Sequence, residues 1–173
     1  EHLAGRTVVI NGVSKAYAMT GWRIGFCAAP SAIAKAVTKL QSQYTSGPSS
    51  IAQKAAEAAY AGSQECVEEM RVAFERRRDL VVELASQIPG LKVNKPQGAF
   101  YLFPEVSSYF GKSYGKWTIK DAPDLCMYLL EEAHVATVSG DAFCLPGYIR
   151  LSYATSDDNI REAMRRIADA LAK

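Results

Sequence analysis

The 173-residue sequence lacks several patterns that mark particular protein classes. It has two histidines, and its four cysteines are far apart with no CxxC pair, which argues against zinc ligation and dithiol chemistry. We therefore expect no metal site. We expect reduced, mostly buried thiols rather than a disulfide framework. These cysteines are Cys27, Cys66, Cys126 and Cys144.

Long apolar runs and blocks of one charge are also missing. No run approaches the ~20 apolar residues that cross a bilayer, and no signal peptide is visible. The net charge is +2, with basic residues scattered among acidic ones, so we expect neither nucleic acid nor a membrane as a partner. The chain begins without methionine, directly before an apolar run, so we expect it to be a piece of a longer protein. Whether a transit segment has been lost stays an open alternative.

What is present indicates an α/β protein. The β-branched run 7–10 is typical of a buried parallel strand, and 24–29 is a second candidate strand. Apolar residues that recur at helical spacing, with Ser31 as the cap, predict a helix from residue 31. A second, alanine-rich helix is predicted to start at Pro48 and to end at Gly62.

Strands mixed with helices in the second part of the chain predict a small α+β layer domain. Long helices are expected over 63–88, from Asp121, and after a cap at Ser156. A hairpin is expected between 91–94 and 99–103, and the polar segment 105–118 reads as a long surface loop. The arginines at 76–78 are expected to be solvated.

Two cations stand in the glycine-rich segment 11–25. An unprotonated lysine amine can form an imine with an aldehyde, and Lys15 follows the end of a predicted strand among small residues that leave room for a flat cofactor. Taken alone, Lys15 would be interpreted as one more surface lysine among the 20 basic residues. Arg23 adds a guanidinium that can hold a phosphate through two hydrogen bonds. Pyridoxal phosphate carries both an aldehyde and a phosphate, so it is the expected cofactor.

The segment "GVSKAYAMTGWRIG" resembles the lysine motif of class I aminotransferases, the fold type I pyridoxal-phosphate family. Four more blocks follow in the family's order: "TSGPSSIAQKAA", "PQGAFYLFP", "SGDAF" and "YIRLSYATSDDNI". The resemblance thus covers nearly the whole chain. It is closest to the bacterial-type aspartate/prephenate aminotransferases of plants.

This resemblance implies a role for three residues. Lys15 would be the Schiff-base lysine, which also moves the substrate's proton; Arg23 would bind the cofactor phosphate; and Arg150 would bind the substrate α-carboxylate. Without the family match, Arg150 could be a strand-end arginine in a surface ion pair. The reaction implied is amino transfer between an amino acid, such as aspartate or glutamate, and a 2-oxo acid, with prephenate as a further substrate. A homodimer and a plastid location, or else the cytoplasm, are implied as well.

The sequence departs from the family pattern at three positions. Gly47 stands where relatives often have asparagine, and Cys144 where they have glycine. Gly12 occupies the position, three residues before the lysine, that is a phosphate-binding serine in many relatives. Ser14 does not simply inherit that role.

The resemblance also implies an incomplete large domain. Residues 1–66 correspond to the C-terminal part of the large cofactor-binding domain, and 67–173 to the small C-terminal domain. The acidic partner of the pyridine nitrogen lies tens of residues before the lysine in the family, whereas fourteen residues precede Lys15 here. We therefore expect the chain alone to be inactive. Two alternatives stay open: an inactive truncated or assembly fragment, and another fold type I enzyme such as an aminocyclopropane-carboxylate synthase.

Overall fold

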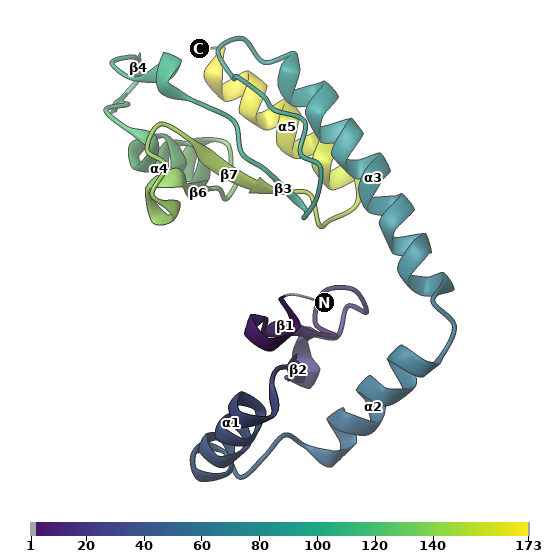
Figure 1. Cartoon of the computed structure of the whole chain (residues 1–173). Coiled ribbons are helices and arrows are strands. Elements are labelled where there is room, and N and C mark those ends of the chain that lie inside the picture. Colours follow the sequence, from purple (N-terminus) through teal and green to yellow (C-terminus); the bar gives the residue numbers. More distant parts are fainter. Residues whose placement is uncertain (1–2, 173) are drawn as a thin grey trace. The chain divides into compact units, whose positions relative to one another are not determined.

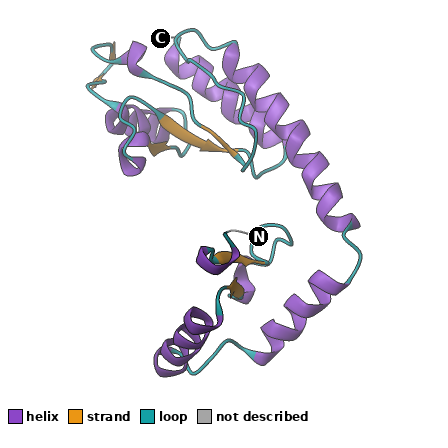
Figure 2. Cartoon of the chain, in the orientation of Figure 1, coloured by secondary structure: helices purple, strands orange, loops and turns teal. Residues whose placement is uncertain are grey.

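The computed structural model describes residues 3–172, which form a mixed α/β structure in two compact units, Glu1–Met70 and Arg71–Lys173 (Figure 1). Both units contain helices and strands (Figure 2). The helix α3, Glu65–Ser86, begins in the first unit and continues into the second.

The first unit contains one two-stranded sheet. Its strands β1, Val9–Gly12, and β2, Gly25–Ala28, pair antiparallel, with Val9 opposite Ala28 and Gly12 opposite Gly25. The prediction of a buried parallel strand was therefore wrong in two respects. The strand pairs antiparallel, and it is not buried, since Ile10 is 80% exposed. A β-branched run favours extended backbone wherever it lies, and the run alone does not specify its partner or its covering layer.

Two helices complete the first unit. They are α1, Ser31–Tyr44, and α2, Ser50–Ala61, and Gly62 follows the end of α2 as predicted. The residue before α1 is Pro30, and no side chain caps the helix, so the predicted Ser31 cap was wrong. The apolar positions of α1 recur as expected, but they are exposed, with Tyr44 at 85%. Short 3-10 helices lie at η1, Ala4–Arg6, and η2, Thr20–Trp22.

The second unit is built on a three-stranded antiparallel sheet in the order β3-β7-β6. The central strand β7, Ile149–Ser152, pairs with β3, Tyr101–Leu102, and with β6, Val138–Ser139. Its remaining elements, besides the continuation of α3, are η3 (Ser107–Tyr109), β4 (Ser113–Tyr114), β5 (Trp117–Thr118), α4 (Ala122–Glu132), η4 (Gly140–Phe143) and α5 (Asp157–Leu171).

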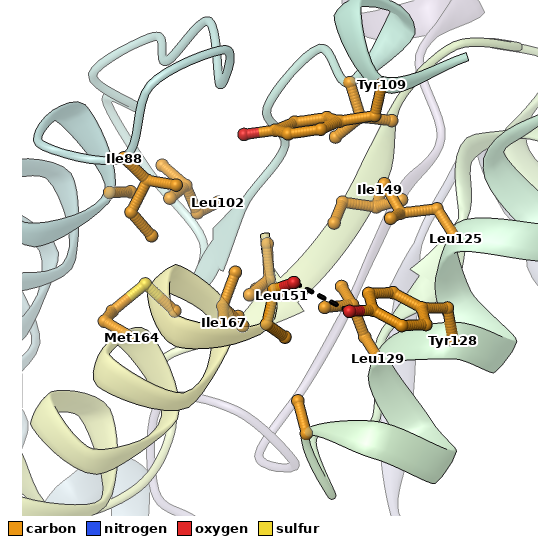
Figure 3. Close-up of a cluster of buried hydrophobic side chains, with 14 of the residues drawn as sticks. Ile88, Leu102, Tyr109, Leu125, Tyr128, Leu129, Ile149, Leu151, Met164 and Ile167 are labelled. Carbon is orange, nitrogen blue, oxygen red and sulfur yellow. Dashed lines mark hydrogen bonds between the residues drawn. The ribbon is translucent and has the colours of Figure 1, made fainter. Parts of the chain in front are cut away.

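The hydrophobic core of this unit lies between the helices and one face of the sheet (Figure 3). Ile149 and Leu151 of β7 point into it, as does Leu102 of β3. The Tyr128 hydroxyl of α4 donates to the Ala170 carbonyl of α5 at 2.7 Å, so its burial leaves no unpaired donor. Because side chains alternate along a strand, Arg150 lies on the face of β7 opposite the core.

Two predictions for the middle of the chain were wrong. Segments 91–94 and 99–103 do not form a hairpin, because β3 pairs with β7, and a single bridge joins Lys92 to Glu105. Segment 105–118 contains η3 and both strands of a small hairpin, β4 and β5, and it buries Val106 and Tyr109 rather than forming a surface loop. The Tyr109 hydroxyl donates to the Pro89 carbonyl, which ties the segment to the end of the long helix.

Charged side chains join α3 to α5. Arg76 Nε lies 3.1 Å from Asp157 Oδ2, and Arg77 Nε lies 3.5 Å from Asp157 Oδ1. Arg78 pairs with Glu75 and Asp79. Arg76 is solvated as expected, with its side chain 61% exposed. The expectation was wrong for Arg77 and Arg78, whose side chains are only 26% and 17% exposed.

The four cysteines are free thiols, as expected, but they are less buried than predicted. Cys66 and Cys144 are exposed, and Cys27 and Cys126 are partly buried. Burial raises the pKa of the Cys126 thiol. Within residues 3–172 there is no cluster of three metal-ligating side chains, and no described helix has the length and apolarity needed to cross a bilayer.

Candidate active site

The site around Lys15 begins with two glycines facing each other across the β1–β2 pair. A Cβ atom on Gly12 would lie 2.9 Å from the Ile24 carbonyl oxygen, and one on Gly25 would lie 3.0 Å from the Asn11 oxygen. The strands therefore approach at a distance that side chains would prevent. A side chain at position 12 of this chain would therefore require the two strands to move apart.

The backbone after Gly12 turns tightly to present Lys15. Val13 is 1% exposed and anchors the turn, the Tyr17 N–H donates to the Val13 carbonyl at 3.3 Å, and the Ala18 N–H donates to the Lys15 carbonyl at 3.2 Å. Ala18 and Arg23 both have left-handed backbone conformations, with φ of 53° and 51°. Such strain in non-glycine residues is typical of functional turns.

Lys15 and Arg23 line the same pocket. Its volume is about 500 Å³, and its walls come from the end of β1, the turn and the start of β2. Ser14 also lines it, which places a hydroxyl beside the two cations. No role was predicted for Ser14 from the sequence, although its position directly before the lysine places it in the same turn. The Arg23 Nη1 donates to the Thr20 carbonyl at 2.9 Å, which fixes part of the guanidinium.

Aromatic side chains hold this turn against its own unit. The Tyr17 ring meets Tyr60 of α2 edge-on at 5.3 Å between centroids, and Tyr60 in turn meets Phe26 of β2 at 5.7 Å. The Tyr17 hydroxyl donates to Gln64 Oε1 at 2.7 Å. These contacts give Tyr17 a packing role.

A second cavity, of about 780 Å³, shares Arg23 with the first and is also lined by Trp22 and Gly47. Gly47 has a φ of 140°, a conformation that residues with a side chain rarely adopt. Glycine therefore suits this chain where relatives often have asparagine.

Arg150 belongs to the second unit, on the central strand β7. Its guanidinium carbon lies 4.4 Å from the centre of the Tyr101 ring and 4.5 Å from the centre of the Phe143 ring. No acidic side chain among the described residues forms an ion pair with it, so the surface-ion-pair interpretation is wrong. Its hydrogen-bonding groups have the planar geometry that suits a carboxylate.

The motif "SGDAF" positions Phe143. The Ser139 hydroxyl caps η4 by accepting from the Asp141 N–H. A Cβ on Gly140 would lie 2.1 Å from the Leu145 carbonyl oxygen, so only glycine fits there. Sequence reasoning assigned no role to Phe143 or to Tyr101, because contacts between strands and distant turns cannot be read from local spacing.

Lys15 and Arg23 are thus brought together in the first unit, and Arg150 stands in the second. The residues around the pocket fit pyridoxal phosphate chemically: an amine can take its aldehyde, and a guanidinium and a hydroxyl can bind its phosphate. No acidic residue is among those lining this pocket.

Comparison with known proteins gives the family. The model of the family "Aminotransferase class I and II" matches residues 1–167. The chain is 48% identical over 172 residues to an aspartate/prephenate aminotransferase of Nitrosomonas europaea, covering 98% of this chain and 43% of that protein. It is 49% identical over 171 residues to a bifunctional aspartate and glutamate/aspartate-prephenate aminotransferase of Petunia hybrida, covering 96% of this chain and 36% of that protein.

The solved structures agree. The crystal structure of an aspartate aminotransferase from Rhizobium meliloti matches with a TM-score of 0.94 at 49% identity, covering 98% of this chain and 43% of that one. The chain therefore spans less than half the length of the relatives it matches. With a family model matching almost all of its residues, the chain belongs to the class I and II aminotransferases.

Proposed function

We propose that this chain is the C-terminal portion of a pyridoxal-phosphate-dependent aminotransferase. The observation that carries the proposal is the shared pocket of Lys15, Arg23 and Ser14. When bound, pyridoxal phosphate supplies an aldehyde that condenses with amines and a ring that accepts electrons.

Lys15 provides the amine at this pocket. Its nitrogen would take the aldehyde of the cofactor, and as a free amine it would also move the proton of the substrate α-carbon. Arg23 and the Ser14 hydroxyl, which line the same pocket, would hold the phosphate oxygens of the cofactor.

Arg150 provides the cation for the substrate. No acidic side chain among residues 3–172 forms an ion pair with the Arg150 guanidinium, so none occupies the N–H groups that would bind the α-carboxylate shared by amino acids and 2-oxo acids. Aspartate and glutamate are the proposed amino donors, with prephenate as an acceptor, because the relatives bear those names.

The remaining assignments follow the same relatives. Residues 1–66 would be the end of a large cofactor-binding domain and 67–173 a small α+β domain, in a homodimer. We place the whole protein in plastids, in keeping with its similarity to a plant enzyme.

Cofactor capture tests this proposal. The 173-residue chain is mixed with pyridoxal phosphate, reduced with borohydride and digested, and the modified peptide is identified by mass spectrometry. We expect the label on Lys15 and its loss in Lys15→Ala. Lys54→Ala is the matched control, because Lys54 is an exposed lysine of the same unit, paired with Glu57. Equal labelling of exposed lysines would favour the inert-fragment alternative.

Turnover is a separate expectation. Because no acidic residue lines the pocket to hold a protonated pyridine nitrogen, the chain alone should show no aspartate-to-oxoglutarate transfer above background. Measurable steady transfer by the purified chain would contradict this.

A further inference from the structure

We infer that Tyr101 and Phe143, here called the aromatic pair, are positioning residues that orient the Arg150 guanidinium for a carboxylate. This inference rests on the proposed function, since it concerns the arginine assigned to the substrate carboxylate. It adds two residues with a physical role in that site.

The first argument is geometric. The strand order β3-β7-β6 puts Arg150 on the central strand, with Tyr101 on the strand at one edge and Phe143 on the turn that follows the strand at the other edge. Both rings lie within 4.5 Å of the guanidinium carbon. Arg150 is therefore contacted by one ring from the side of β3 and by another from the side of β6.

The second argument is energetic. An arginine side chain has about 2 kcal/mol of rotamer entropy, which must be lost before its planar fork can meet a carboxylate. An ion pair with a protein acid would restrain it but would occupy the N–H groups of the fork. A ring over the flat face restrains the guanidinium while its N–H edge stays open, and it leaves the charge in place.

Each ring is itself supported. Phe100 packs against Tyr101 at 4.5 Å between centroids, and Phe103 meets Phe143 edge-on at 5.9 Å. Phe103 in turn stacks on Tyr148 at 5.8 Å. The capped turn and the obligatory Gly140 fix the backbone from which Phe143 projects. Restraint of Arg150 thus extends through a row of aromatic contacts into the sheet.

The test uses NMR on the 173-residue chain. The Arg150 Nε–Hε resonance reports nearby rings directly, and its change on titration with succinate, at constant ionic strength, reports carboxylate binding. The variants are Tyr101→Leu, Phe143→Leu, the conservative Tyr101→Phe, and Arg150→Gln. Trp117→Leu is the matched control, because it removes a ring with a cation, Lys116, over it elsewhere in the same unit.

We expect the Arg150 resonance to move toward its random-coil position in each leucine variant of the aromatic pair, and the succinate Kd to rise about 3- to 10-fold. Tyr101→Phe and Trp117→Leu should bind as the parent chain does. A purely structural role for the rings would raise the succinate Kd only together with shifts of the amide signals of Ile149 and Leu151.

The outcomes separate the two proposals. Binding that is lost in Arg150→Gln but unchanged in both leucine variants overturns the role of the aromatic pair and leaves the carboxylate role of Arg150 intact. Binding that does not depend on Arg150 overturns the carboxylate role, and the positioning role with it. Should Tyr101→Leu fail to fold, Phe143→Leu still decides, because Phe143 is 44% exposed and its truncation removes little core.

Discussion

Cys144 occupies a backbone conformation that favours glycine. Its φ is 58° and its ψ 28°, in the left-handed region, directly after the turn that carries Phe143. For a residue with a Cβ, this conformation costs about 1–2 kcal/mol. The chain therefore carries local strain beside the proposed carboxylate site.

We expect Cys144→Gly to raise the free energy of unfolding of the second unit by up to ~1 kcal/mol, since relief of strain is offset in part by the greater freedom of glycine in the unfolded chain. The side chain is exposed, so few contacts are lost. Urea unfolding measures the change. Cys144→Ala is the control: it removes the thiol but retains the Cβ, and it should leave stability unchanged. A gain in the alanine variant equal to that of glycine would contradict the strain explanation.

At the scale of elements, local signals in the sequence predicted helices better than strands. The cap at Ser156 was confirmed, because its side chain accepts from the Asn159 N–H. The helix expected from Asp121 was confirmed as well, and the Asp121 side chain accepts from the Asp124 N–H. The strand that pairs with β3 could not be predicted, because β7 lies some fifty residues away in the sequence. Which strand pairs with β3 depends on which strand faces fill the hydrophobic core.

The same contrast holds in the candidate site. Lys15 and Arg23 are eight residues apart in one turn, so their shared pocket follows from local sequence. The contacts of Arg150 with Tyr101 and Phe143 cross strands, and the motifs around these rings, "GAFYLF" and "SGDAF", do not by themselves specify the contact.

The segment containing η3 gives a prediction about pH. Burial, with a smaller contribution from Tyr114, raises the pKa of Tyr109 to about 12 from its usual 10. Because the pKa of Tyr109 is higher in the folded chain than in the unfolded chain, the unfolded chain loses the hydroxyl proton at a lower pH. The contribution to stability is therefore complete below pH 10 and is lost as the pH rises toward 12.

Urea unfolding at pH 9 and pH 11 checks this, with Tyr109→Phe as the comparison. The variant should be less stable by about 1 kcal/mol at pH 9, since it lacks the hydrogen bond to the Pro89 carbonyl. It should lose less stability than the parent chain on going to pH 11. Some loss will remain, because burial also raises the pKa of Tyr114, Tyr128 and Tyr153. Identical losses in the two proteins would exclude Tyr109 as a source.

At the scale of the whole molecule, the two units differ in how much apolar surface they bury. Within the described residues, the first unit has two buried hydrophobic side chains, Val13 and Ala52, while the second has a continuous core. Hydrophobic burial is the main favourable term in folding, so the stability of the described chain resides mostly in the second unit.

Amide hydrogen exchange on the 173-residue chain tests this difference. We expect the amides of β7 and α5 to exchange only through unfolding of the second unit, and those of β1 and β2 to exchange at least ~100-fold faster through local opening. Leu102→Ala should destabilise the core by about 2–5 kcal/mol and speed exchange in β7 while leaving β1 and β2 unchanged. Equal protection in both units, or a parallel response of β1 to Leu102→Ala, would show that they unfold as one body. The pocket of Lys15 and Arg23 would then have the stability of the full core rather than that of a two-stranded sheet.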